Sequence, residues 1–398
     1  MSEWKEYRLG DVGKIVTGKT PKTAITDNYG GNIPFLSPSD NMELKYVPIT
    51  ARHLTEKGLA EVKSCLIPEN SVCVSCIGSD MGKSVITVRP IVTNQQINSI
   101  IPSSNFDTNF LYYILQNKKR EIKFLGMNGT AVPILNKSAF SNLTILAPEL
   151  DEQRSIASIL SSLDSKIENN RKICANLEAQ AQALFKHWFI DFAPFKDGKF
   201  VESELGMIPE GWRVGTFGEI AELIKPSIKP RENVVYSHYS IPSFDDNQTP
   251  SNDYGESIKS NKFAIHDSVT MLSKLNPDHK RIWYIDKVER NAVCSTEFLP
   301  FYAKDKEQSA FVYCYLNCKQ NYREIANGAK GTTNSHQRID ANAILSRKIA
   351  YDSEAISQFS ILVVDFMKQK DIAVHENSRL STLRDTLLPK LMSGEIKV

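Results

Sequence analysis

The sequence predicts an α+β fold in which two mixed α/β globular domains are joined by two long helices. The helices are expected to pair as an antiparallel coiled coil, and the whole chain to form an internal repeat with approximate two-fold symmetry. Three observations support this: two heptad stretches of apolar residues, a duplicated sequence pattern, and strand-like segments confined to the regions that precede each heptad stretch. Apolar residues at alternating spacings of four and three are typical of a coiled-coil seam rather than of an ordinary surface helix.

The first heptad stretch occupies residues 151–192, near the middle of the chain. Acidic residues precede and open it, where the helix dipole favours negative charge, and Pro194 follows it and cannot continue the helix. The predicted seam residues are Ile156, Leu160, Leu163, Ile167, Leu177, Leu184 and Trp188. A helix of about 55 Å with such a seam needs a second helix to cover it.

The second heptad stretch, residues 353–398, supplies that partner. Its predicted seam residues are Val363, Phe366, Leu380, Leu387 and Leu391. Each stretch also carries a seam asparagine, Asn170 or Asn377. A polar seam residue can fix helix register at some cost in stability. The alternative is a solvated side chain at a loosely packed place, and both interpretations remain open at this point.

Composition limits the classes of protein to consider. The chain has 398 residues, 41% hydrophobic and 24% charged, which suits two or three globular domains. It has no apolar stretch of membrane-spanning length, and its seven cysteines are scattered, so we expect a cytoplasmic protein without disulfides. The net charge of +2 excludes a polycation. If the protein binds nucleic acid, its basic groups must therefore cluster on one face.

The chain reads as two diverged copies of one unit of about 200 residues. Trp4 and Trp212 are each followed by glycine and an acid at matching positions, and Leu177 of the first heptad stretch matches Leu380 of the second. The predicted domains are 1–150 and 209–352, with helices at 151–192 and 353–398 and a Gly- and charge-rich linker at 193–208. A fragment ending near Phe192 would expose its seam, so we expect it to dimerise through antiparallel pairing of two identical helices.

Within each globular domain, β-branched segments predict strands and longer apolar segments predict one helix. We expect strands at 71–77, 84–88, 268–272 and 281–285, and helices at 110–124 and 309–325.

Several motifs suggest ligand sites, but the positions of their residues do not match those that such sites require. Residues 78–84, GSDMGKS, have three residues between their glycines where a phosphate loop needs four, so we interpret them as a turn between strands. Cys73 and Cys76 lie within one predicted strand, and Cys314 and Cys318 within one helix. Buried apolar cysteine is a better interpretation than zinc binding for all four. We therefore predict no metal site and no catalytic residues.

One alternative is a self-sufficient metal-dependent nuclease. Asp40, Glu61 and Lys63 loosely resemble a core in which two acids hold Mg²⁺ and a lysine assists the attacking water. Pro-Ser-Asp at 38–40 is also a common turn sequence, and such short patterns arise often by chance.

Polar loops suited to reading bases are the remaining candidates for function. Asn94, Gln95 and Gln96 supply amides that can pair with adenine, and lysines nearby in sequence can hold phosphates. The candidate phosphate-binding residues of the first domain are Lys19, Lys22 and Lys83. The candidates in the second domain are Lys274, Asn276, Lys280, Arg281, Thr332, Asn334, His336 and Arg338. For any single residue, a solvated loop is the competing interpretation.

Several longer motifs resemble those of one known family. They are LDSKIENN (163–170), LFKHWFIDF (184–192), SELGMIPEGW (203–212), LLPKLMSGEI (387–396), TGKTP (17–21) and TNQQIN (93–98). Together they resemble the specificity subunit of type I restriction–modification enzymes, over the whole chain. The second domain departs from the pattern because it lacks the TGKTP and TNQQIN motifs, so its placement rests on Trp212 and the helix that follows the domain.

The resemblance implies a noncatalytic subunit with two target-recognition domains that reads a bipartite double-stranded DNA target. It implies assembly with two modification subunits, which bind S-adenosylmethionine and methylate adenine, and with restriction subunits, which use ATP and Mg²⁺. No cofactor is expected in this chain itself. Besides the nuclease, a coiled-coil scaffold without a DNA role is an alternative that the residues alone leave open.

Overall fold

The computed structural model describes all residues except 1–3, 48, 128–133 and 330–336. Contacts divide the chain into two compact units: unit 1 is Met1–Lys166 with Leu380–Val398, and unit 2 is Ile167–Arg379. These divisions differ from the predicted domain boundaries because each long helix contributes to both units.

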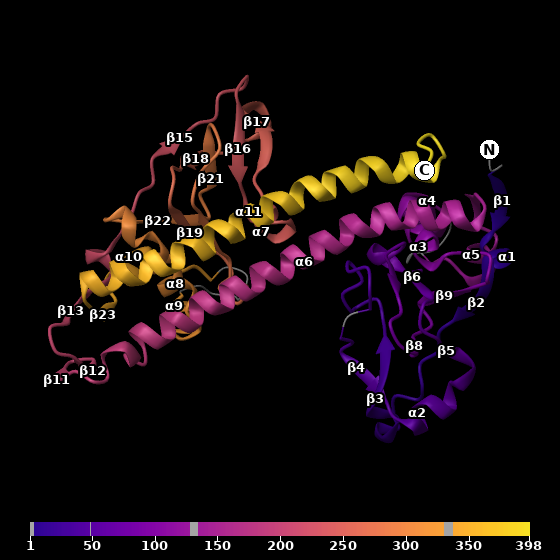
Figure 1. Ribbon diagram of the computed structural model, residues 1–398, viewed down its shortest axis with the longest axis horizontal. Coiled ribbons are helices and arrows are strands. Elements are labelled where there is room, and N and C mark those ends of the chain that lie inside the picture. The colour runs from indigo at the N-terminus through magenta and orange to yellow at the C-terminus, as the bar shows by residue number, and fades with distance from the viewer. Residues whose placement is uncertain (1–3, 48, 128–133, 330–336) are drawn as a thin grey trace. The chain divides into compact units, whose positions relative to one another are not determined.

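The two long helices are α6 (Leu150–Phe189) and α11 (Ser353–Met392). In unit 1 the first part of α6 lies beside the last part of α11, and in unit 2 the last part of α6 lies beside the first part of α11 (Figure 1). The helices therefore pack antiparallel within each unit. This arrangement, together with the mixed sheets described next, confirms the predicted fold class.

Unit 1 contains two four-stranded sheets and a short ribbon. The antiparallel sheet has the order β2 (Gly13–Thr17), β9 (Ile97–Pro102), β6 (Val72–Ser75), β7 (Ser84–Ile86). The mixed sheet has the order β4 (Arg52–Leu54), β3 (Tyr29–Leu36), β8 (Ile91–Thr93), β5 (Leu66–Ile67), with β3 and β8 parallel. The ribbon pairs β1 (Lys5–Arg8) with β10 (Thr144–Ala147). The predicted strands at 71–77 and 84–88 correspond to β6 and β7.

Unit 2 repeats this topology, with one additional edge strand in its mixed sheet. Its antiparallel sheet has the order β14 (Ala221–Leu223), β22 (Phe298–Ala303), β19 (Val269–Ser273), β20 (Ile282–Ile285). Its mixed sheet has the order β15 (Ser227–Ile228), β18 (Lys262–Ala264), β21 (Ala292–Ser295), β16 (Val235–Tyr239), β17 (Ser251–Tyr254), with β16 and β21 parallel. Its ribbon pairs β13 (Arg213–Thr216) with β23 (Lys348–Tyr351). The matching order of the sheets agrees with the internal duplication seen in the sequence.

Each predicted globular-domain helix is in fact two helices. Unit 1 has α3 (Thr108–Asn117) and α4 (Lys119–Gly126), and unit 2 has α8 (Ser309–Asn317) and α9 (Lys319–Asn327). The single-helix predictions at 110–124 and 309–325 were wrong because Lys118 and Cys318 leave helical backbone geometry. The break separates a helix that is largely buried from an amphipathic one with an exposed polar face.

The smaller helices connect these sheets. Unit 1 contains α1 (Leu9–Val12), α2 (Glu56–Glu61) and α5 (Lys137–Ser141), and unit 2 contains α7 (Ile241–Asp246) and α10 (Ala341–Leu345). Within the described ranges, no helix is both long and apolar enough to cross a membrane.

The segment predicted as a linker, 193–208, has secondary structure of its own. The hairpin of β11 (Phe200–Ser203) and β12 (Gly206–Pro209) occupies its second half, and Gly206 takes a positive φ of 93° at the turn. Ile208 is buried in the core of unit 2, which holds the hairpin against it. Helix α6 also ends earlier than the predicted residue 192, because the backbone turns left-handed at Phe192.

All predicted seam residues are buried or half-buried. The buried ones are Ile156, Leu160, Ile167, Leu177, Val363 and Leu391, and the half-buried ones are Leu163, Leu184, Trp188, Phe366, Leu380 and Leu387. The buried stripe of α6 is wider than a seam, since Phe185 is 1% exposed although it lies outside the predicted positions. Helix α8 causes this widening, because Phe311 of α8 packs on Phe185 from a second side.

Candidate nucleic-acid interface

The structure brings together the two polar segments of the first domain that the sequence marks separately. Residues 17–21 follow β2 and residues 93–98 precede and open β9, which is the neighbouring strand. The amide of Gly18 donates to the carbonyl of Ile97 at 3.1 Å, and the amide of Lys19 to that of Thr93 at 2.9 Å. The Thr20 hydroxyl donates to Gln95 Oε1 at 2.7 Å. We call these two segments the paired loops.

The close approach of the paired loops depends on glycine at position 18. A Cβ atom added there would lie 2.2 Å from the carbonyl oxygen of Asn94 and 2.3 Å from that of Thr93. Both neighbours are backbone atoms, so they cannot move aside as a flexible side chain would. Glycine therefore sets the distance between the two segments.

The residues in and next to the paired loops that were predicted to contact DNA differ in their exposure to solvent. Lys19, Lys22 and Gln95 are exposed. Asn94 is buried, and its amide group bonds with Gln96, which makes a structural turn. The burial of Asn94 leaves its side chain unsuited to the base contact predicted for it.

Lys83 is separate from this surface. Its ammonium group forms ion pairs with Asp80 at 2.6 Å and with Glu43 at 2.7 Å. The hydrogen bond to Asp80, followed by that to Glu43, raises the pKa of Lys83. The predicted phosphate contact would have to compete with two carboxylates that this lysine already neutralises.

In unit 2 the structure again joins two polar segments. Leu275 and Arg338 form a β-bridge, and the amide of Ile339 donates to the carbonyl of Lys274 at 2.9 Å. Lys274 and Arg338 both approach Glu297, at 3.9 and 3.2 Å. Asn276 sits at the turn with a positive φ of 53°. Three further candidates, Thr332, Asn334 and His336, lie outside the described residues.

Two other candidates of unit 2 are held by local partners. Arg281 binds both carboxylate oxygens of Asp245, at 2.6 and 2.8 Å, and this contact lowers the pKa of Asp245. Lys280 donates to the carbonyl of Asn317 at 2.5 Å and lies over the ring of Tyr322. Burial lowers the pKa of Lys280. Both cations have structural roles that the sequence does not reveal.

The two acidic residues of the alternative nuclease site accept hydrogen bonds from nearby backbone amides. Asp40 accepts from the amides of Ser37 and Ala51, each at 2.8 Å. Glu61 accepts from the amide of Lys22 at 3.0 Å, and this hydrogen bond contributes most to lowering the pKa of Glu61. Among the residues that the structure describes, no three His, Cys, Asp or Glu side chains group as metal ligands would.

The motifs interpreted as structural occupy structural positions. Residues Gly78–Asp80 form a turn between β6 and β7. Cys73, Cys76, Cys314 and Cys318 are free and buried. Burial raises the pKa of Cys73 to about 12 and that of Cys76 to about 11, which disfavours the thiolate form that binds metal.

Comparisons with known proteins place the chain in a family. The type I restriction modification DNA specificity domain matches residues 1–179. The MjaIX type I restriction enzyme specificity subunit of Methanocaldococcus jannaschii is 30% identical over 422 aligned positions, covering 100% of this chain and 94% of the relative. The chain belongs to the type I restriction enzyme specificity subunits. The predicted resemblance is thereby confirmed.

Two further proteins agree. The HindI specificity subunit of Haemophilus influenzae is 35% identical over 175 residues, or 42% of this chain and 38% of that protein. A crystal structure of a type I S subunit from M. genitalium matches this specificity subunit with a TM-score of 0.60, over 98% of this chain and 96% of that one. At 16% identity, the structural match supports the fold alone.

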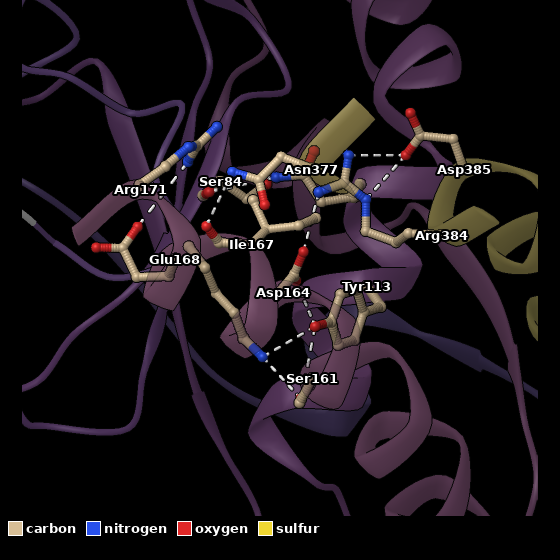
Figure 2. A network of polar contacts seen from close by, with 12 residues as sticks. Ser84, Tyr113, Ser161, Asp164, Ile167, Glu168, Arg171, Asn377, Arg384 and Asp385 are labelled. Atoms are coloured by element: carbon tan, nitrogen blue, oxygen red, sulfur yellow. Dashed lines mark hydrogen bonds and ion pairs between the residues drawn. The ribbon is translucent and has the colours of Figure 1, made fainter. Parts of the chain in front are cut away.

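Sequence reasoning missed two polar networks of this specificity subunit. The first, in unit 1, joins Tyr113, Ser161, Asp164 and Arg384 (Figure 2). Lys45 joins this network by donating to Tyr113 and Ser161. Tyr113 of α3 donates to Asp164 of α6 at 2.5 Å, and Arg384 of α11 donates to the other oxygen of Asp164 at 2.9 Å. The network therefore ties a globular-domain helix to both long helices.

The second network, in unit 2, joins Glu178, Tyr313, Asn317 and Lys370. Glu178 of α6 accepts from Tyr313 and Asn317 of α8, and from Lys370 of α11 at 2.6 Å. Burial, followed by the nearby charge of Glu178, raises the pKa of Tyr313 well above its usual value, so the hydroxyl stays protonated as a donor. Tyr113 and Tyr313 lie on the corresponding helices α3 and α8 of the two repeats, and comparing these helices could have drawn attention to their tyrosines.

The seam asparagines lie together in unit 2. Asn170 is 2% exposed and donates to Asn377 at 3.0 Å and to Glu376 at 2.7 Å. Asn377 in turn donates to the carbonyl of Ile167 at 3.3 Å. Asn170 is therefore a buried, bonded side chain rather than a solvated one.

Lys45 gives the first network a measurable pH dependence. Burial lowers the pKa of Lys45 to about 8, against 10.5 when it is exposed, although Asp164 opposes the shift. As the pH rises from 7 to 9.5 the folded state loses this proton before the unfolded state does, so the protein should become more stable. Lys45→Met should remove this rise, a change of about 1–2 kcal/mol in the free energy of unfolding. Denaturant titrations across this pH range test the expectation.

Lys14→Met is the matched control, because Lys14 is an exposed lysine of the same unit. An unchanged pH profile in Lys45→Met, or an equal change in Lys14→Met, would contradict the role of Lys45.

Proposed function

We propose that this chain is the noncatalytic DNA-reading subunit of a type I restriction–modification complex. Its relation over the full length to a type I restriction enzyme specificity subunit carries the proposal. The chain reads a bipartite double-stranded DNA target, one part with each globular domain, and positions two adenine-methylating modification subunits and the restriction subunits. S-adenosylmethionine, ATP and Mg²⁺ belong to those partner subunits.

The paired loops of unit 1 are proposed to contact one half of the target. Gln95 is exposed and oriented by its hydrogen bond from Thr20, as suits an amide that reads a base edge. Lys19 in the same loops and Lys22 just after them in sequence are exposed and provide charge for phosphates. Side-chain amides next to cations form a combination that can read sequence and hold the backbone at one place.

In unit 2 the joined segments around Lys274 and Arg338 are proposed to contact the other half of the target. Glu297 lies between these cations and offsets part of their charge. A carboxylate near bases can accept from the amino group of cytosine, which distinguishes this surface from the paired loops. Two surfaces of different chemistry suit a target whose two halves differ in sequence.

The proposal predicts different effects for Gln95 and Lys19. In the complex with modification subunits, Gln95→Ala should lose about 1–3 kcal/mol of discrimination at one base pair, because it removes a base contact. Lys19→Ala should weaken binding to all sequences and reduce the salt dependence by about one phosphate contact. Methylome mapping and DNA-binding isotherms at several salt concentrations measure the two effects.

Lys57→Ala is the matched control, because Lys57 is an exposed lysine of the same unit paired with Asp27. Altered methylation at both halves of the target would show that the domains do not read independently. Cleavage of plasmid by the purified chain with Mg²⁺ alone would instead favour the nuclease alternative.

A further inference from the structure

Two ion pairs between the two long helices have the same polarity. In unit 1 the pair joins Asp164 to Arg384, and in unit 2 it joins Glu178 to Lys370. Both acids lie on α6 and both bases lie on α11. The side chains are 15–29% exposed, so water replaces a lost partner poorly.

The polarity matters because α6 and α11 are repeats of one another. The match of Leu177 to Leu380 aligns Ala181 with Arg384 and Ile167 with Lys370. If a second copy of α6 took the place of α11, Asp164 would face alanine and Glu178 would face isoleucine.

The hydrogen bonds of the seam asparagines, Asn170 and Asn377, would also be lost if α6 paired with a second copy of itself. The same alignment places Cys174 at the position of Asn377. Asn170, which is 2% exposed, would then lose the amide oxygen and the carboxylate that now accept its hydrogen bonds. A buried amide without an acceptor is unfavourable.

Pairing of α11 with a second copy of itself is also unfavourable, because its basic residues would lose their acidic partners. The alignment places Met367 at the position of Asp164 and Ser381 at that of Glu178. Arg384 and Lys370 would then lie among α11 residues that supply no carboxylate at those positions. Apolar contacts alone distinguish these pairings poorly, because apolar residues recur at most of the matching seam positions of the two helices.

We propose that these polar contacts make α6 select α11 and reject a second copy of itself, so that each chain closes its own helix pair. The specificity arises because self-pairing of either helix lacks the ion-pair and hydrogen-bond partners that the pairing of α6 with α11 provides. Other coiled coils achieve specificity in the same way. The sequence alone predicts that a fragment ending near Phe192 forms a homodimer. The polar contacts predict instead that this fragment pairs with α11 whenever α11 is present. The apolar seam favours association, whereas the polar layers direct it to α11.

The full chain allows a test after folding. A protease site at the exposed Asp197–Gly198 bond would cut the folded protein between α6 and the β11–β12 hairpin. The nicked protein is then held in denaturant at the foot of its unfolding transition, where fragments exchange, and is analysed by native mass spectrometry. We expect the one-to-one complex of 1–197 with 198–398 to persist, with less than about one tenth as homodimers of 1–197.

The nicked double variant Arg384→Ala, Lys370→Ile gives α11 the residues found in α6. Its fragments should pair less selectively, with homodimers of 1–197 rising from less than about one tenth toward the one quarter of random pairing, because only the hydrogen bonds of Asn170 still favour α11. Lys368→Ala is the control, because Lys368 is an α11 cation that pairs with Asp365 of its own helix, and its pairing should stay one-to-one.

A swapped variant, Asp164→Arg with Arg384→Asp, keeps the charges complementary and guards against a double variant that fails to fold. It should retain one-to-one pairing. Homodimers of 1–197 as abundant in the nicked parent as in the double variant would overturn the proposal, as would loss of selectivity in the swapped variant.

Discussion

Phe185→Ala is expected to lower the free energy of unfolding of unit 2 by about 3–5 kcal/mol. Phe185 is 1% exposed, and its ring lies 5.3–6.4 Å, between centroids, from the rings of Phe189, Phe311, Tyr315 and Phe359. The substitution removes a side chain that joins α6, α8 and α11 at one place. The surrounding rings come from three helices and cannot all close the cavity.

Denaturant unfolding followed by tryptophan fluorescence measures the effect, since Trp188 and Trp212 lie in the same core. Phe124→Ala is the matched control: Phe124 is 67% exposed, and its loss should change stability by less than about 0.5 kcal/mol. A Phe185→Ala protein as stable as the parent would show that α6 is not held through this aromatic cluster.

Gly18→Ala is expected to separate the paired loops and to abolish reading of one half of the DNA target. The added methyl group would lie 2.2–2.3 Å from backbone oxygens of Asn94 and Thr93, so the segment carrying Lys19 and Thr20 must move away from Gln95. Overpacking of this kind costs about 1–3 kcal/mol. The loss of recognition should exceed the loss of stability, because both proposed contacts of this surface are displaced together.

Methylation by the complex with modification subunits, together with the melting temperature, separates the two effects. Gly10→Ala is the control, because a methyl group there makes ordinary contacts at 3.5 Å, with Ser141. Unaltered methylation in a Gly18→Ala protein whose melting temperature has fallen would mean that the paired loops do not read DNA.

The sequence alone predicted the features that depend on local pattern. The heptad spacing predicted α6 and α11 to within a few residues at their ends, except that α11 ends at Met392. The duplicated pattern around Trp4 and Trp212 indicated two similar domains, and the sheets have the same order in both units apart from the additional edge strand β15. Helix periodicity and sequence repeats are properties of the linear sequence, so they can be recognised without knowing which distant residues are in contact.

The roles of individual polar residues were decided by contacts between distant parts of the chain. Asn94 and Gln95 are neighbours in sequence, yet one is buried in a turn and the other is exposed beside Thr20. Arg281 was predicted as a DNA contact, but it binds Asp245, which no sequence spacing indicates. A side chain's charge and size are fixed by its type, whereas its availability depends on which groups the fold brings within hydrogen-bonding distance.

The pairing of α6 with α11 likewise depends on both the sequence and the tertiary structure. The sequence determined that α6 needs an apolar partner, because an exposed seam of that length is unfavourable in water. Tertiary structure decided the polar contacts of that pairing, by placing Arg384 beside Asp164 and Lys370 beside Glu178. Apolar contacts are nondirectional and leave several pairings similar in energy, whereas an ion pair at a half-buried position requires one particular partner at one particular place.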